Sequence, residues 1–259
     1  MNIVLKVAYD GSSYLGWQKT KMGQSIEETL SQALSQILNE EIFLQAASRT
    51  DAGVHAAGQI VNFFTVKPIA SPPDFKIQVT CLLPEDITVT ECSIAPDDFH
   101  PSLDASWKEY IYELCYGDVQ LPFTRNYSWH FPYPLHLAEM QAAARLLLGT
   151  HNFRSFCNVR KPEGYSCYER SLYQLNIIDL GSNRLRFEIR GNHFLYKMVR
   201  NLVGTLVYVG CGKMKKEQIP GLLAGKQRNL AGVTAPACGL TLHRIHYGHF
   251  VNEELFSCP

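Results

Sequence analysis

Apolar residues in the first hundred positions follow two periods, one typical of strands and one typical of a helix. Residues 26–38 carry apolar side chains at helical spacing, and Ser25 with Glu28 forms the signature of a capping box. Short β-prone segments predict strands at 3–9, 42–47, 59–64 and 87–93. With a weaker helical pattern at 74–83, the order is β-α-β-β-α-β, the ferredoxin-like arrangement.

The same order recurs after a segment rich in proline and aspartate at 96–104, which we interpret as a boundary. Helices are expected at 137–148, 194–209 and 216–224. Strands are expected at 110–116, 171–179, 184–190 and 240–247. The sequence therefore predicts an α+β fold of two ferredoxin-like or RRM-like βαββαβ units, with mostly antiparallel sheets and a catalytic cleft between them. The expected domains cover residues 1–105 and 106–259.

Composition and cysteine usage indicate a protein of a reducing compartment. The 259 residues, 46% of them hydrophobic, are enough for one large domain or two ordinary ones. No apolar run approaches the roughly 20 residues of a membrane-spanning helix, and the N-terminus lacks the features of a signal peptide. None of the 8 cysteines forms a C-x-x-C pair, which argues against a zinc site and a dense disulfide framework. We expect a cytoplasmic protein that does not bind a membrane.

The formal net charge of +0 hides an asymmetry between the two halves. Residues 1–105 hold 6 Lys and Arg against 13 Asp and Glu, whereas residues 106–259 hold 18 against 11. Such asymmetry favours a polyanion-binding surface on the second half. Candidate RNA contacts lie in a stretch rich in Phe, Tyr and Asn, because arginine beside aromatic residues suits phosphate pairing and base stacking; they are Arg154, Arg160, Lys161 and Arg170.

Arg49-Thr-Asp51 is the leading candidate for catalysis. A nucleophilic carboxylate must be ionised, and a nearby guanidinium favours the ionised form. Arg49 is close in sequence, and a distant arginine from the second half can serve equally well. The alternative is an ordinary solvated β-turn, because aspartate and glycine are common turn residues.

Two residues of the second half are candidates for the same site. Arg200 is an isolated charge beside Val199 and Leu202 in an apolar helical segment, where burial is costly unless the charge is paired. Pairing with Asp51 is one interpretation, and an arginine extended to the surface is the other. Tyr110 begins a strand, and a tyrosine facing a cleft can stack on a base and offer a hydroxyl for proton transfer. The alternative is that Tyr110 packs in the hydrophobic core.

The sequence predicts no binding site for a metal ion or a nucleotide cofactor. On a strand, His246 points away from His243 and His249, and the latter two stand about 20 Å apart. The chain has no G-x-x-x-x-G-K-[ST] phosphate loop and no G-x-G-x-x-G. We therefore expect chemistry that uses protein side chains alone.

Seven motifs occur together, in the order 9–18 (YDGSSYLGWQ), 49–55 (RTDAGVH), 86–100 (DI and DFH), 110–112 (YIY), 151–156 (HNFRSF), 198–204 (MVRNLVG) and 234–240 (TAPACGL). In these motifs the sequence resembles the TruA family of tRNA pseudouridine synthases, nearly from end to end. The resemblance implies that Asp51 is the nucleophile, that Tyr110 lies against the target base, and that Arg200 pairs with the aspartate. It also implies a homodimer that isomerises uridines in the anticodon stem-loop, at tRNA positions 38–40, without a cofactor.

The sequence departs from the family pattern at Ser48, where glycine is usual, and at Lys108, a common arginine position that is also a candidate RNA contact. An alternative function is a non-catalytic RNA-binding protein of two RRM-like units, although no RNP1 string is visible. Another is a glycosidase with a pair of carboxylates, for which Glu109 is the nearest second acid. No DNA partner is expected.

Overall fold

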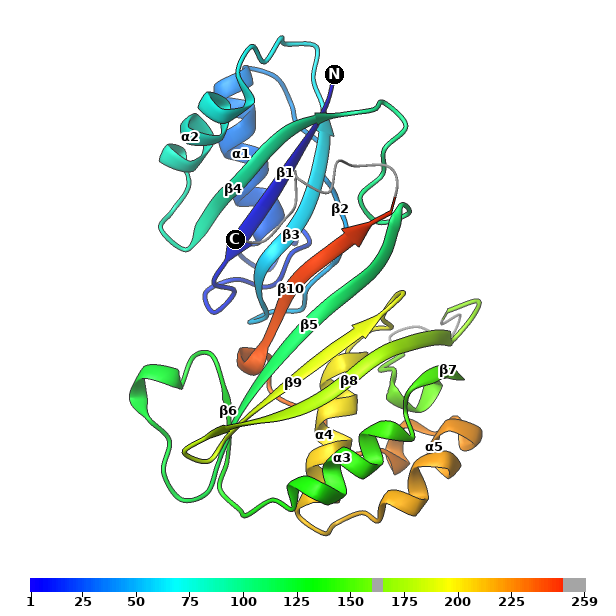
Figure 1. Cartoon of the computed structure of the whole chain (residues 1–259). Coiled ribbons are helices and arrows are strands. Elements are labelled where there is room, and N and C mark those ends of the chain that lie inside the picture. Colours follow the sequence, from blue (N-terminus) through cyan, green and yellow to red (C-terminus); the bar gives the residue numbers. More distant parts are fainter. Residues whose placement is uncertain (160–164, 249–259) are drawn as a thin grey trace. The chain divides into compact units, whose positions relative to one another are not determined.

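The computed structural model describes residues 1–159 and 165–248, which form an α+β fold with mostly antiparallel strands (Figure 1). The helices are α1 (Ile26–Leu38), α2 (Pro72–Leu82), α3 (Leu137–Arg145), α4 (Met198–Gly210) and α5 (Ile219–Gly225). The 3-10 turns are η1 (Pro122–Thr124), η2 (Arg154–Phe156), η3 (Lys216–Gln218), η4 (Arg228–Leu230) and η5 (Ala237–Gly239). The strands are β1 (Asn2–Tyr9), β2 (Gln45–Ala46), β3 (His55–Phe64), β4 (Ile87–Ala95), β5 (Ala105–Tyr116), β6 (Trp129–Phe131), β7 (Gly149–Asn152), β8 (Glu169–Gly181), β9 (Arg184–Gly191) and β10 (Leu240–Tyr247).

The chain forms two compact units. The first contains residues 1–107 together with the described residues from Thr241 on, and the second contains residues 108–240. The last strand, β10, therefore groups with the first unit, whereas the sequence placed it in a domain of residues 106–259. The physical reason is its pairing, because Thr241 and Leu242 lie parallel to His55 and Ala56 of β3.

In the first unit, β1 is the central strand and runs antiparallel to both β3 and β4. Helices α1 and α2 cover one face of this sheet (Figure 1). Helix α1 begins where the sequence predicts, because the Ser25 hydroxyl accepts a hydrogen bond from the Glu28 amide at 3.3 Å. Its buried apolar stripe consists of Ile26, Leu30, Ala33, Leu34 and Leu38. Each buried leucine or isoleucine contributes about 1.5–3 kcal/mol.

In the second unit, β9 lies between β5 and β8 and is antiparallel to both, while β7 extends the sheet beyond β8. Helix α3 packs against β8 and α4. Helix α4 has its apolar side chains buried nearly all round, from Met198 to Val209. This burial explains why its sequence shows no single polar face.

Several boundaries differ from the sequence-based expectation for local physical reasons. The helix expected from 194 begins at Met198, because Lys197 adopts the left-handed backbone conformation with φ 60°. The strand expected at 42–47 pairs only at Gln45–Ala46. Strand β3 begins four residues earlier than expected, at His55. The short strands β6 and β7 were not expected at all.

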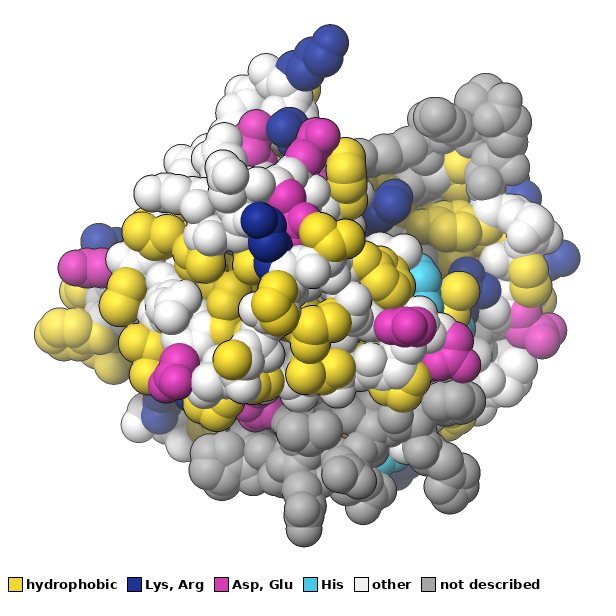
Figure 2. Space-filling model, turned by 90° about the horizontal axis from the view of Figure 1, so that it is seen from above, with side chains coloured by type: hydrophobic (Ala, Val, Ile, Leu, Met, Phe, Trp, Pro, Cys, Tyr) yellow, Lys and Arg dark blue, Asp and Glu magenta, His cyan; other side chains and the backbone are white. Residues whose placement is uncertain are grey.

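Figure 2 shows one face of the molecule, on which Lys and Arg side chains are interspersed with Asp and Glu and with hydrophobic residues. No helix in the described part of the chain is both long enough and apolar enough to cross a membrane.

Candidate functional site

The Asp51 segment forms a tight turn that leads into β3. The Val54 amide donates to the Asp51 carbonyl at 3.1 Å, and Gly53 has φ 77°, the left-handed value that a type II turn needs at its third position. Thr50 is buried, Asp51 is half-buried, and Arg49 is exposed. The segment is thus a turn, as its composition indicates, and it holds the Asp51 carboxylate at the first position of that turn.

Residues of the 9–18 motif hold this turn in place. The Trp17 amide donates to the Thr50 carbonyl at 3.1 Å, and the Tyr9 and Thr50 hydroxyls are 2.8 Å apart. Gly16 has φ 92°, and a Cβ there would lie 2.7 Å from the Thr50 carbonyl oxygen, so glycine is required for the close approach. The first motif is therefore a scaffold for the second.

Asp10, Tyr14, His55 and Asp86 form a polar layer beside the turn. Nδ1 of His55 accepts from the Gly11 amide at 3.1 Å and lies 3.0 Å from Oδ1 of Asp10. The Tyr14 hydroxyl donates to Oδ1 of Asp86 at 2.6 Å. Burial, followed by the charges of Asp86 and Asp10, raises the pKa of Tyr14, so the phenol stays protonated and remains a donor. Motif residues Asp86 and His55 thus have a structural role in this unit.

Gln59 fixes the start of the Asp51 segment, and sequence reasoning missed it. Its side chain is fully buried, its amide nitrogen donates to the Ser48 carbonyl at 2.6 Å, and its amide oxygen accepts from the Ser48 amide at 3.2 Å. Two hydrogen bonds to one backbone residue set the direction from which the chain enters Arg49.

We expect Gln59→Leu to lower the free energy of unfolding by about 1–3 kcal/mol, because it removes both buried hydrogen bonds to Ser48 while nearly preserving volume. Urea unfolding at equilibrium measures the difference. Gln45→Leu is the matched control, since Gln45 is exposed and is expected to change stability by less than about 0.5 kcal/mol. Equal effects of the two substitutions would contradict the role given to Gln59.

Tyr110 and Arg200 both belong to the second unit. Tyr110 lies on β5 opposite Ile189 of β9, is 6% exposed, and meets the Phe194 ring edge-on at 5.1 Å between centroids. Arg200 lies in the first turn of α4, where its Nε donates to the Ala235 carbonyl at 2.7 Å. The Ala235 amide in turn donates to the Arg200 carbonyl at 3.1 Å. Because Asp51 belongs to the first unit, its pairing with Arg200 and Tyr110 stays a prediction.

Arg228 holds the loop that contacts Arg200, and the sequence gave no expectation for it. Its guanidinium donates to the Asn158 amide oxygen at 3.0 Å, the Asn201 amide oxygen at 2.7 Å and the Gly232 carbonyl at 2.8 Å. Asn201 is fully buried in an apolar helix. A buried asparagine directly after Arg200 was the sequence signal for this network, because a buried amide requires partners.

The basic candidates of the second half differ in their surroundings. Arg154 is exposed in η2, and its guanidinium lies 5.1 Å from the centre of the Tyr168 ring. Lys108 on β5 is only 6% exposed, and burial lowers its pKa from 10.5 to about 8. Arg160 and Lys161 lie outside the described residues. The RNA contacts assigned to these four residues and to Arg170 stay a prediction.

Replacing Lys108 by methionine is expected to stabilise the protein at pH 7 by about 2 kcal/mol, because the ammonium group is buried at a cost. Below pH 8 the lysine is charged in both states. Between pH 8 and 10.5 the folded protein releases this proton and the unfolded chain keeps it, so the stability of the parent protein rises with pH. The advantage of Lys108→Met should therefore shrink from pH 7 to pH 9.5 in urea unfolding. An advantage that is independent of pH would show that Lys108 is not the titrating group.

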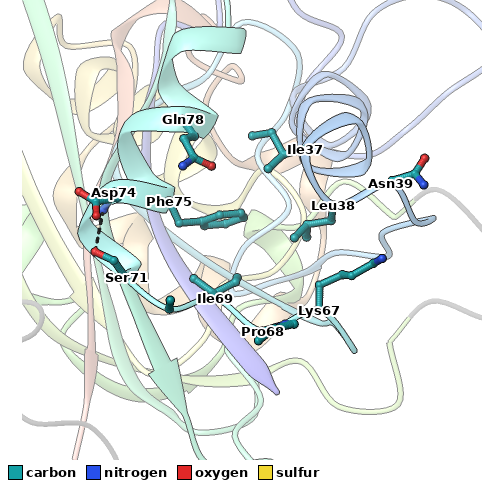
Figure 3. A pocket seen from close by; sticks show the side chains of 11 residues that line it. Ile37, Leu38, Asn39, Lys67, Pro68, Ile69, Ser71, Asp74, Phe75 and Gln78 are labelled. Atoms are coloured by element: carbon teal, nitrogen blue, oxygen red, sulfur yellow. Dashed lines mark hydrogen bonds between the residues drawn. The ribbon is translucent and has the colours of Figure 1, made fainter.

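A cavity of about 510 Å³ lies in the first unit, between the end of α1, the 67–71 segment and the start of α2 (Figure 3). The side chains of Ile37, Leu38, Ile69 and Phe75 turn toward one another around it. The 67–71 segment follows the end of β3, whereas Asp51 lies before the start of β3. A strand of ten residues spans roughly 30 Å, so β3 separates the cavity from Asp51 by about that length. None of the lining residues belongs to the Asp51 turn. The cavity is therefore separate from the candidate catalytic site.

A family model described as tRNA pseudouridine synthase matches residues 6–104 and 143–248, most of the chain. The chain belongs to the TruA family of tRNA pseudouridine synthases. It is 51% identical over 246 residues to tRNA pseudouridine synthase A 2 of Protochlamydia amoebophila, covering 95% of this chain and 94% of that protein. It is 41% identical over 248 residues to tRNA pseudouridine synthase A of Thermoanaerobacter sp., covering 95% and 99%. TruA family membership, expected from the motifs, is confirmed.

Among solved structures, a chain of a Cbf5–Nop10–Gar1 complex matches with a TM-score of 0.40 and 13% identity, over 96% of this chain and 50% of that chain. The site assignments rest on the motifs of the sequence and on the contacts described above.

Proposed function

We propose that this protein isomerises uridine to pseudouridine in the anticodon stem-loop of tRNA, with Asp51 as the nucleophile. The observation that carries the proposal is the anchored turn of a TruA-family chain. Thr50 is held through both its carbonyl and its hydroxyl, and Asp51 follows as a half-buried carboxylate beside an exposed Arg49. Precise placement of a nucleophile by a rigid backbone is what such a reaction requires.

The reaction needs no external electron donor or acceptor. The N-glycosidic bond between N1 of uracil and C1′ of ribose breaks, and a bond between C5 and C1′ forms. The C5 proton leaves to solvent and N1 takes up a proton from solvent, so the product is an isomer of uridine. The Asp51 carboxylate adds either to the uracil ring or to C1′ and is released when the new C–C bond is complete. Because the change is redox-neutral, the proposal includes no cofactor.

Tyr110 and Arg200 are proposed to act with Asp51. Tyr110 presents an aromatic ring to the extruded base, and the edge-on contact with Phe194 fixes its orientation. Arg200, tied to Ala235, supplies a guanidinium that favours the ionised form of a carboxylate. Extruding the base costs a few kcal/mol, and phosphate contacts with aromatic stacking offset this cost.

The partners follow from the same proposal. Uridines 38–40 of the tRNA anticodon arm are the proposed targets, a homodimer is the proposed assembly, and the cytoplasm is the proposed location. The second unit is proposed as the domain that binds the RNA backbone, because residues 108–240 hold 17 Lys and Arg against 9 Asp and Glu.

Incubation with a tRNA transcript that carries tritium at C5 of uridine tests the function. Release of tritium to water and pseudouridine at the anticodon arm by mass spectrometry are the expected results. Tight binding of the tRNA with no change in nucleoside composition would replace this proposal by the non-catalytic RNA-binding function. Pseudouridine outside the anticodon arm would correct the target site alone.

A further inference from the structure

Two tyrosines and two arginines gather on the second unit outside the proposed catalytic residues. Tyr165 and Tyr168 meet edge-on with 5.7 Å between ring centroids. The Arg154 guanidinium lies 5.1 Å from the centre of the Tyr168 ring, and that of Arg170 lies 5.9 Å from the centre of the Tyr165 ring. We call these four residues the tyrosine–arginine cluster. Each ring thus has a cation over it.

The cluster is accessible, and no carboxylate of the described residues neutralises its charges. Arg154 is exposed and Tyr165 is 39% exposed, while Tyr168 and Arg170 are half-buried. Among the residues that the structure describes, neither Arg154 nor Arg170 forms an ion pair with a carboxylate.

Two arginines of the neighbouring strand β9 show the contrasting arrangement. Nε of Arg186 lies 2.7 Å from Glu113, and a terminal guanidinium nitrogen of Arg190 lies 3.0 Å from Glu109. Those two arginines cross-link β9 to β5. The cluster arginines lie over aromatic rings instead, an arrangement suited to an anionic partner from outside the chain.

The 192–197 segment connects the cluster to the residues proposed for catalysis. The Tyr196 amide donates to the Tyr165 hydroxyl at 3.0 Å, and the Tyr196 carbonyl accepts from the Asn158 amide at 3.2 Å. Two residues earlier, Phe194 contacts Tyr110. One short segment of backbone therefore fixes both the cluster and Tyr110 within the same unit.

We propose that the tyrosine–arginine cluster binds an unpaired nucleotide of the substrate RNA, with the base stacked on the tyrosine and guanidinium faces and its phosphate paired with Arg154. Unpaired bases stack on aromatic rings and on guanidinium planes, and guanidinium groups bind phosphate oxygens through two parallel hydrogen bonds. The inference rests on the proposed function for the identity of the RNA. It adds a second contact point on the strand that carries the target uridine.

RNA explains these residues better than an acidic peptide does. A carboxylate-bearing peptide needs cations alone, whereas the cluster places both cations against flat aromatic surfaces that suit a base. The tilt of the two rings, 73° between their planes, offers a face and an edge in one place.

The test uses the full-length protein, an unmodified tRNA transcript with a fluorescent 5′ label, and anisotropy at several salt concentrations. Tyr168→Leu and Arg154→Gln are each expected to raise the Kd for the transcript about tenfold. The two variants should differ in their salt dependence. Arg154→Gln should lower the slope of log Kd against log salt by about 0.7–0.9, the value of one lost phosphate contact, and Tyr168→Leu should leave the slope unchanged.

Matched controls come from the same unit. Tyr173 is exposed at 55% on β8, and Arg125 is exposed after η1, so Tyr173→Leu and Arg125→Gln should leave the Kd within about twofold of the parent. Thermal melting of all four variants identifies any that fails to fold. Arg154→Lys then serves as a second variant, expected to keep the salt slope and still lose affinity, because lysine lacks the planar stacking surface.

Cluster variants that bind the transcript as tightly as the controls, in a protein that makes pseudouridine, would overturn this inference and leave the proposed function intact. Unchanged tRNA affinity together with lost retention on immobilised polyglutamate would assign the cluster to an acidic peptide and also overturn it. Reduced RNA affinity in a protein that converts no uridine would support the cluster and refute the proposed function.

Discussion

Asp51→Asn is expected to abolish tritium release from the labelled tRNA, lowering turnover by about 10⁴-fold or more. Asparagine nearly matches aspartate in shape, and the turn is held through Thr50, Gly53 and the Asp51 carbonyl, none of which depends on the carboxylate. The substitution therefore removes a nucleophile without removing its support. Tritium release measures turnover, and anisotropy with the same transcript should show a Kd within about threefold of the parent.

Asp97→Asn is the matched control for this experiment. Asp97 is exposed on the loop after β4, in the same unit, and the same change of charge there should leave turnover within about twofold. A melting temperature of Asp51→Asn equal to that of the parent excludes unfolding as the cause. Turnover of Asp51→Asn near the parental rate would rule out the assigned nucleophile, and the proposed mechanism would then fail.

The elements that the sequence predicted best are those whose local signals agree with their tertiary contacts. Helix α1 has a capping serine and an apolar stripe, and it begins at Ile26 as expected. Strand β10 covers 240–247 as expected. The start of α4 differs, because the helical period runs back to Phe194 while the backbone of Tyr196 is used by Asn158 and Tyr165. Tertiary hydrogen bonds decided that boundary, and periodicity carries no information about them.

In the candidate site, too, the sequence predicted the residues that have a local signal and missed those whose contacts are distant in sequence. Asp51, with its flanking arginine and glycine, was visible as a short motif, and so was its location on a turn. Gln59 and Arg228 were not visible, because their partners are distant in sequence: Gln59 bonds Ser48 11 residues earlier, and Arg228 bonds Asn158 70 residues earlier. Neither residue lies in a local pattern of its own, and only Asn201, a polar residue in an apolar helix, pointed to the network that includes Arg228. The structure finds both residues through buried hydrogen bonds.

A substitution at Gly204 tests whether the packing of α4 holds Arg200 in place. A Cβ at Gly204 would lie 1.7 Å from the Val233 carbonyl oxygen, and a Cβ at Gly232 would lie 2.5 Å from the Gly204 carbonyl oxygen. The helix and the 232–235 segment therefore touch through two glycines. The same segment carries Ala235, whose carbonyl and amide both bond Arg200.

Gly204→Ala is expected to lower the free energy of unfolding by about 3 kcal/mol or more, although alanine favours a helix by about 1 kcal/mol over glycine. The backbone contact must open, and Ala235 moves with it, so turnover on tRNA should also fall. Gly221→Ala in α5 is the matched control, and its effect on the free energy of unfolding is expected to have the opposite sign. The reason is that no atom lies within 4 Å of the position that a Cβ of residue 221 would take. That variant should gain about 0.5–1 kcal/mol. Urea unfolding compares the two, and a Gly204→Ala protein as stable as Gly221→Ala would show that the close packing of α4 on the 232–235 segment does not hold Arg200 in place.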